Sequence, residues 1–161
     1  YILPQVKEYF GDYEVISVEE KLMQKIDEFD AKGRKFKGFI DLVLKTKDNK
    51  YHIIDWITCS WGWNLQKRTD KLITYQLTLY KHFFAKKHNI DTKLIETHFA
   101  LLKRTSKKNR VEIFRVTSGE KKTDNAMALL EKAVNNIQRN RHIKNRLSCA
   151  RCEFHKTKHC P

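Results

Sequence analysis

The stretches Lys37-Gly-Phe-Ile-Asp-Leu-Val-Leu44 and Tyr51-His-Ile-Ile-Asp-Trp-Ile-Thr58 each carry one aspartate within a run of mainly apolar and β-branched residues. Such runs are typical of strands, and the polar segment Thr46-Lys-Asp-Asn-Lys50 between them is typical of a turn that joins antiparallel neighbours. A buried carboxylate is costly unless a cation or hydrogen bonds compensate for it. We therefore expect Asp41 and Asp55 to lie side by side at a metal site.

The alternation of side chains along a strand assigns the residues around Asp55 to two faces. One face carries Tyr51, Ile53, Asp55 and Ile57, and the other carries His52, Ile54, Trp56 and Thr58. Residue 57 therefore points the same way as Asp55, one pleat further along.

The order Gly38-Phe-Ile-Asp41, a hairpin, and then Ile53-Ile-Asp-Trp-Ile-Thr58 resembles the PD-(D/E)XK nuclease superfamily, especially its RecB-type and mitochondrial-exonuclease-like branches. Their last motif reads Ile-Ile-Asp-x-Lys-Thr, so Ile57 stands at the position of the motif lysine. The resemblance implies that a lysine there positions the attacking water and offsets phosphate charge, which isoleucine does not. Three explanations are open: an engineered inactive variant, a natural pseudo-nuclease, or a lysine that arrives from elsewhere, with Lys67 and Lys71 nearest.

The resemblance covers about residues 13 to 118 and implies a set of site residues. Asp41, Asp55 and the backbone carbonyl of Trp56 would hold one or two Mg²⁺ or Mn²⁺ ions. The family's Gln-x-x-x-Tyr pattern matches Gln76 and Tyr80, which share one helical face at i, i+4 spacing and would position the phosphate. The segment 15 to 22 resembles the family's first strand, so Glu19 is either a further ligand or a surface residue.

The chain has 33 lysines and arginines against 19 acidic residues, a formal charge of +14 and a pI near 9.7. This excess favours a polyanionic partner, with a basic surface kept for solubility as the alternative. The candidate nucleic-acid contacts are Lys35, Lys37, Trp61, Lys67, Arg68 and Lys71. Trp61 could stack on a base, although Trp56, Trp61 and Trp63 are most simply packing residues.

Coarse patterning predicts an α/β fold with a mixed central sheet flanked by helices. The resemblance implies that this is a restriction-endonuclease-like core. Strands are expected over 13–22 and in two hairpins, one spanning 36–58 and the other formed by 94–102 and 111–117. Helices are expected over 67–88 and 124–146; the second has an apolar stripe at Met127, Leu130, Val134 and Ile137. We expect one nuclease core over residues 1–147, preceded by a missing segment because the chain begins at Tyr1, and a cysteine-rich tail over 148–161.

The tail places Cys149, Cys152, His155, His159 and Cys160 within twelve positions. Three thiolates with either His155 or His159 would complete a tetrahedral zinc site. RecB-type nucleases often end in a similar cluster, so the resemblance implies a [4Fe–4S] centre completed by an upstream cysteine. A reduced tail without metal, or one with an adventitious disulfide, is the remaining interpretation.

These expectations together favour a metal-dependent DNA nuclease, and the resemblance implies exonuclease action in replication, recombination or repair with partner proteins of those processes. Two alternatives remain: a non-catalytic nucleic-acid-binding module, and a metal-stapled interaction domain with incidental aspartates. No apolar stretch in the sequence reaches the length of a membrane span and no secretory leader is visible, so we expect an intracellular protein without a membrane partner.

Overall fold

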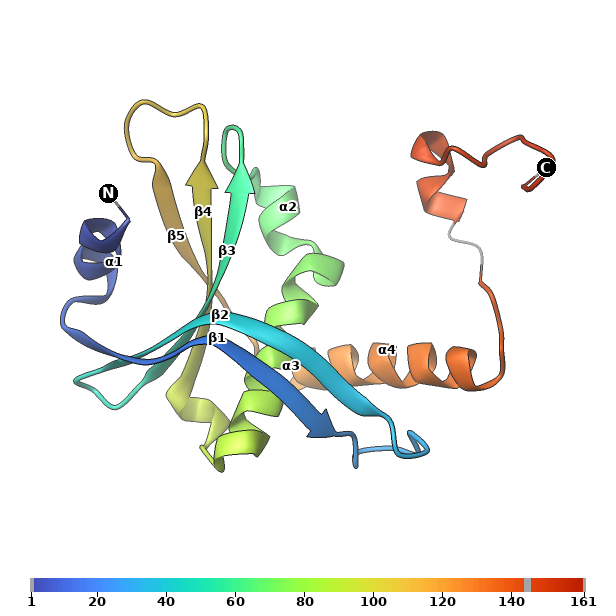
Figure 1. The fold of residues 1–161 in the computed structure, drawn as a ribbon, viewed down its shortest axis with the longest axis horizontal. Coiled ribbons are helices and arrows are strands. Elements are labelled where there is room, and N and C mark those ends of the chain that lie inside the picture. The colour runs from blue at the N-terminus through green and yellow to red at the C-terminus, as the bar shows by residue number, and fades with distance from the viewer. Residues whose placement is uncertain (1, 144–145, 161) are drawn as a thin grey trace.

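A computed structural model describes residues 2–143 and 146–160 (Figure 1). Five strands form one sheet whose spatial order follows the chain: β1 (Tyr13–Lys25), β2 (Lys35–Thr46), β3 (Tyr51–Cys59), β4 (Ile95–Lys103) and β5 (Val111–Val116). β3 and β4 run parallel, and the other neighbouring pairs run antiparallel. The predicted mixed sheet is therefore confirmed.

The helices cover the two faces of this sheet unequally. They are α1 (Leu3–Phe10), α2 (Leu65–Thr69), α3 (Lys71–His88) and α4 (Glu120–Gln138), with short 3-10 turns η1 (Thr92–Leu94) and η2 (Arg146–Arg151). α3 connects β3 to β4 and lies across one face, with α4 packed against it (Figure 1). α1 packs against the other face.

Two apolar clusters result from the alternation of side chains along β3. Ile53 packs in the larger cluster together with Leu77 and Phe83 of α3, whereas Ile54 packs in a smaller cluster with Val6 of α1. Both isoleucines are fully buried. The helix over residues 3–10 was not predicted from the sequence, although a strand that is buried on both faces must be covered on both sides.

Two predicted helices have different limits in the structure. The helix expected over 67–88 is divided at Asp70, whose carboxylate accepts hydrogen bonds from the N–H groups of Leu72 and Ile73 and so starts α3 anew. The helix expected over 124–146 begins earlier, at Glu120, and ends at Gln138. Asn140 has a φ of 51°, a left-handed conformation that stops an α-helix.

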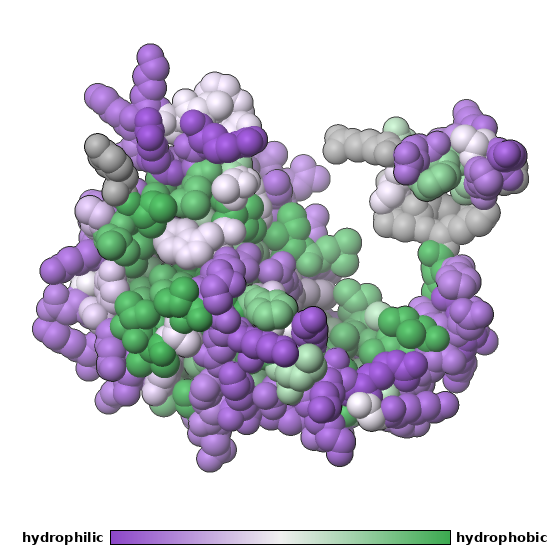
Figure 2. Space-filling model, in the orientation of Figure 1, coloured by the Kyte–Doolittle hydropathy of each residue, from purple (hydrophilic) through white to green (hydrophobic). Residues whose placement is uncertain are grey.

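Most of the visible surface is hydrophilic (Figure 2). An apolar patch interrupts it over the first half of β1, where Val15, Ile16 and Val18 are exposed. In the described part of the chain, every helix is too short or too polar to cross a membrane.

Candidate active site

The sheet opens between β2 and β3 at the two aspartates. Their backbone pairing runs from Lys45↔Tyr51 to Leu42↔Ile54 and stops there, although one more step of the same register would set Asp41 opposite Asp55. Instead, Oδ2 of Asp41 accepts a hydrogen bond from the backbone N–H of Trp56 at 2.7 Å. The Asp41 carboxylate thus accepts a hydrogen bond from an N–H group of β3 that is no longer paired with the backbone of β2. This bond holds Asp41 beside Asp55.

Asp55 lies on the face covered by α3, as do Ile53 and Ile57, in agreement with the predicted alternation. It is only 8% exposed. Nε2 of Gln76 on α3 donates to Oδ1 of Asp55 at 3.2 Å and lies 3.3 Å from the hydroxyl of Tyr80. The i, i+4 pair predicted from the sequence therefore faces this carboxylate.

Gly38 allows Tyr80 to reach the site. A Cβ atom at position 38 would lie 2.6 Å from Cε1 of the Tyr80 ring, closer than two carbon atoms approach. The Tyr80 ring therefore packs directly on the backbone of β2 at Gly38, the glycine of the Gly-x-Ile-Asp segment.

Burial and the neighbouring charge of Asp41 raise the pKa of Asp55 to about 7. Neither cause is a cation, although the chain as a whole carries a charge of +14. Burial also raises the pKa of Tyr80, so its hydroxyl stays protonated at neutral pH. The site thus concentrates negative charge where solvent screens it poorly, which is the environment that a divalent cation stabilises.

The oxygen atoms available here suit a hard cation. One oxygen of each carboxylate is held by a protein N–H, which leaves Oδ1 of Asp41 and Oδ2 of Asp55 without a donor among the described residues. The N–H and C=O groups of one strand residue point to the same side of the strand. Because the Trp56 N–H points toward Asp41 on β2, the Trp56 carbonyl also points to that side, where the backbone of β2 is no longer paired. Asp41, Asp55 and the Trp56 carbonyl are the metal ligands predicted from the sequence.

Ile57 packs its side chain against the apolar cluster beneath α3. Neither lysine considered as a substitute acts on the pKa of Asp55. The ammonium of Lys67 lies 4.5 Å from the centre of the Trp63 ring, and Lys71 lines a separate cavity with Thr117 and Gly119.

The proposed nucleic-acid contacts are distributed in several environments. Lys35 and Lys37 are exposed on β2, and Lys37 lines a groove together with Gln76 and Tyr80. Trp61 is 82% exposed, so it is not a packing residue, whereas Trp63 is buried. Arg68 pairs with Glu112 and donates to the Trp63 carbonyl, so its guanidinium is already engaged within the fold.

Glu19 is exposed and has a left-handed φ of 51°, whereas Glu20 is buried. Glu20 pairs with Lys87 and His88 near the end of α3, away from Gln76 and Tyr80 along that helix. The register between β1 and β2 shifts between Val15 and Ser17, and such an irregularity changes which residues face the core. Sequence periodicity alone could not locate that shift.

The tail contains free thiols at Cys149, Cys152 and Cys160, and backbone hydrogen bonds link Cys152 to Cys149 and His155 to Cys152. Within the described residues, these thiols and the imidazoles of His155 and His159 do not gather into one set of metal ligands. A zinc or iron–sulfur site in the tail stays a prediction.

Comparison with known proteins identifies the family and the fold of the chain. Residues 2–157 match the family model described as the PD-(D/E)XK nuclease superfamily. Among solved structures, the chain resembles SSO0001 with a TM-score of 0.57 and 16% identity, over 95% of this chain and 63% of that one. It also resembles a proposed exonuclease from Eubacterium rectale with a TM-score of 0.52 and 10% identity, over 95% of this chain and 55% of that one.

The chain therefore spans less than two thirds of either solved protein, and the low identities make these likenesses of fold alone. No curated protein matches the sequence. The family model nevertheless covers nearly all of the residues given. The chain belongs to the PD-(D/E)XK nuclease superfamily.

Proposed function

We propose that this chain is the core of a metal-dependent nuclease that hydrolyses DNA phosphodiester bonds, as an exonuclease in replication, recombination or repair. The observation that carries the proposal is the pair Asp41 and Asp55, which lie together where the sheet opens. The pKa of the buried Asp55 is raised by burial and by Asp41, with no cation among the causes. In so basic a protein, this local excess of negative charge indicates a site built for a metal ion.

Mg²⁺ or Mn²⁺ fits the donor set because both ions prefer oxygen ligands. Asp41, Asp55 and the carbonyl of Trp56 would hold the ion, as they do by resemblance in the family. When bound, such an ion lowers the pKa of a water molecule and stabilises charge that develops on the phosphate.

Gln76 and Tyr80 position the groups around the ion. Nε2 of Gln76 lies within hydrogen-bond distance of both Asp55 and the Tyr80 hydroxyl, so it fixes their mutual arrangement. Because burial raises the pKa of Tyr80, its hydroxyl remains a hydrogen-bond donor at neutral pH and can donate to a phosphate oxygen.

A groove beside these two residues offers a path for a single strand. It has a volume of about 400 Å³ and runs between α3 and α4, with Lys37 and Tyr75 among its lining residues and apolar side chains such as Leu129 along the wall. Bases stack on aromatic and apolar surfaces while lysines contact phosphates, so this composition suits unpaired DNA next to the carboxylates.

Ile57 supports a second candidate function, a nucleic-acid-binding module without catalysis. The side chain occupies the lysine position of the motif and packs into the core, so it offers no donor to water or phosphate. Loss of catalysis would leave the fold and the basic surface in place.

Substitution of Ile57 by lysine distinguishes the nuclease from the non-catalytic binding module. Residue 57 faces the same side as Asp55, so a lysine there can place its ammonium beside the metal-bound water and the phosphate. The control is Thr58→Lys, which adds the same charge to the opposite face of β3 at an exposed position. Both variants are made in the complete natural protein that contains residues 1–161 and are incubated with Mg²⁺ or Mn²⁺.

The substrates are end-labelled linear and circular DNA, single-stranded and double-stranded. We expect metal-dependent cleavage of linear DNA by Ile57→Lys, none by Thr58→Lys, and loss of cleavage when Asp55→Ala is added. Cleavage by the unaltered protein would mean that another lysine serves, and Lys67→Ala and Lys71→Ala would identify it. Intact DNA binding without cleavage by Ile57→Lys would instead establish the non-catalytic module.

A further inference from the structure

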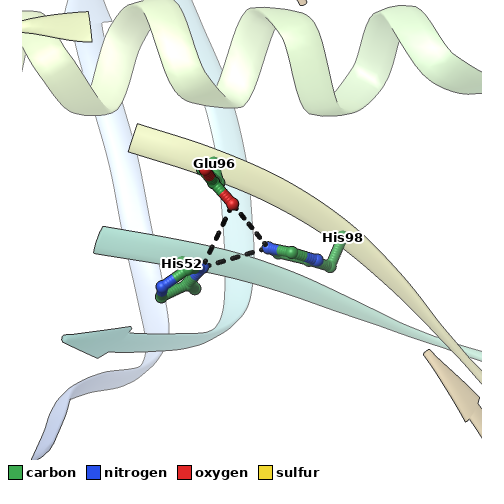
Figure 3. A group of neighbouring side chains, drawn as sticks. All are labelled: His52, Glu96 and His98. Carbon is green, nitrogen blue, oxygen red and sulfur yellow. Dashed lines mark hydrogen bonds and ion pairs between the residues drawn. The ribbon is translucent and has the colours of Figure 1, made fainter. Parts of the chain in front are cut away.

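Three further ligand-type side chains converge on the sheet face that α1 covers. His52 lies on β3, and Glu96 and His98 lie two residues apart on the parallel neighbour β4, so all three project to the same face (Figure 3). Nδ1 of His52 lies 3.1 Å from Nε2 of His98, and Oε2 of Glu96 lies 3.9 and 4.0 Å from these nitrogens. Asp41 and Asp55 contribute nothing to this group.

These separations match those of ligands that share one ion. Metal–ligand bonds of about 2.0 to 2.2 Å in a tetrahedral arrangement place neighbouring ligand atoms roughly 3.3 to 3.6 Å apart. The two imidazole nitrogens are within hydrogen-bond distance of each other, whereas Oε2 of Glu96 is beyond it from both, so hydrogen bonding does not explain why Glu96 joins them. We propose that His52, Glu96 and His98 bind one zinc-class divalent metal ion, at a site distinct from the nuclease centre.

Hydrogen bonds around His52 orient it for this role. The hydroxyl of Thr46 donates to Asp48 at 2.5 Å, so its oxygen accepts from Nε2–H of His52 at 3.0 Å. This contact places the imidazole proton on Nε2 and directs the lone pair of Nδ1 toward Glu96 and His98. A metal-binding imidazole is commonly held through its other nitrogen in this way.

Glu96 is held in a corresponding manner through its other oxygen. Oε1 of Glu96 forms ion pairs with Lys50 and Arg115, each at 3.3 Å, and Oε2 faces the imidazoles. The two cations therefore fix the carboxylate without occupying the oxygen that would bind the metal.

His98 is the most deeply buried of the three side chains. The residue is 2% exposed, and its Nδ1 has no hydrogen-bond partner among the described residues. Its Nε2, the nitrogen that faces His52 and Glu96, is the atom that would bind the ion.

A cavity of about 530 Å³ opens onto the three side chains. Tyr9 and Phe10 of α1 stand over the imidazoles, with ring centroids 4.9 to 5.7 Å from them. The cavity leaves room for a fourth ligand, such as water, while imidazole and carboxylate ligands favour Zn²⁺, Co²⁺ or Fe²⁺ over Mg²⁺. The ion would join β3 to β4.

The test measures Zn²⁺ retained by the protein after dialysis against a buffer that contains millimolar Mg²⁺. The starting protein is the complete natural chain with Cys149→Ser, Cys152→Ser and Cys160→Ser, so that tail thiols do not contribute. We expect one Zn²⁺ per chain, located by anomalous diffraction at the zinc edge between His52 and His98. A stoichiometric increase in thermal stability should accompany binding.

Glu96→Gln is the principal variant because it keeps the side-chain shape and one oxygen for Lys50 and Arg115. His52→Gln provides a second variant if the first folds poorly, and circular dichroism checks the fold of each. Either should weaken zinc binding at least about 100-fold, since even indirect partners of metal ligands contribute 10- to 100-fold. The matched control Asp55→Asn should retain one Zn²⁺. Absence of zinc from the starting protein, or unchanged affinity in folded Glu96→Gln and His52→Gln, would overturn the proposal.

Discussion

Substitution of Asp55 by asparagine should stabilise the metal-free protein at neutral and higher pH. Asparagine keeps the shape of the side chain and the oxygen that accepts from Gln76, while it removes the charge. The folded-state pKa of Asp55 is about 7, against 3.8 for the ordinary group. At about 1.36 kcal/mol per pKa unit, this difference makes ionised Asp55 cost the folded state up to roughly 4 kcal/mol.

The pH dependence has a definite sign. Below pH 3.8 the carboxyl is protonated in both the folded and the unfolded chain, so Asp55 and asparagine are equivalent in charge. Between pH 3.8 and about 7 the unfolded chain loses this proton first, and the stability contributed by Asp55 falls as pH rises. Above pH 7 the cost is complete, and the advantage of Asp55→Asn is constant.

The assay is chemical or thermal unfolding of both proteins in EDTA between pH 4 and 8. We expect a difference of less than about 1 kcal/mol near pH 4 and an advantage of about 2 to 4 kcal/mol for Asp55→Asn at pH 8, which is roughly 5 to 15 °C for a chain of this size. Asp124→Asn, at an exposed position of α4, is the matched control and should be neutral. Millimolar Mg²⁺ should stabilise the unaltered protein more than the variant. Equal stability of the two proteins at pH 8 without metal would refute the assignment of Asp55 as an uncompensated buried carboxylate.

Two further predictions concern DNA binding and the packing beneath the site. If phosphate contacts supply most of the affinity, binding of a short labelled DNA should weaken by at least about 100-fold between 50 and 200 mM salt, measured by fluorescence anisotropy; a flat salt dependence would remove the charge argument. Gly38→Ala should displace Tyr80 and destabilise the protein by about 1 to 3 kcal/mol in urea unfolding. Gly119→Ala, where an added Cβ meets nothing within 4 Å, should have a much smaller effect, and equal effects would contradict the close approach of Tyr80.

The sequence was sufficient to predict the elements that carry the carboxylates. The alternation around Asp55 and the i, i+4 spacing of Gln76 and Tyr80 are local patterns, and β3 and α3 follow them. The opening of the sheet at Asp41 is not local, because it depends on where β2 leaves β3. The sequence pattern placed the two aspartates in neighbouring strands but gave no sign of the hydrogen bond from Trp56 to Asp41.

The group on the other face of the sheet was outside the reach of sequence patterns. His52 is separated from Glu96 and His98 by a helix, and only the parallel pairing of β3 with β4 brings them together. The one available signal was that Glu96 and His98, at i and i+2 in a strand, must share a face. Ile53 and Ile54 point to opposite faces of β3, and the structure identifies α1 as the element that covers the Ile54 face.

The central claim is that Asp41 and Asp55 hold one divalent cation where β2 and β3 separate. The most direct measurement is an anomalous difference map from crystals grown with Mn²⁺. The account predicts a peak bonded to one oxygen of each carboxylate, at roughly 2.0 to 2.6 Å. A map in which Mn²⁺ is absent from the pair, or bound only by His52, Glu96 and His98, would contradict it.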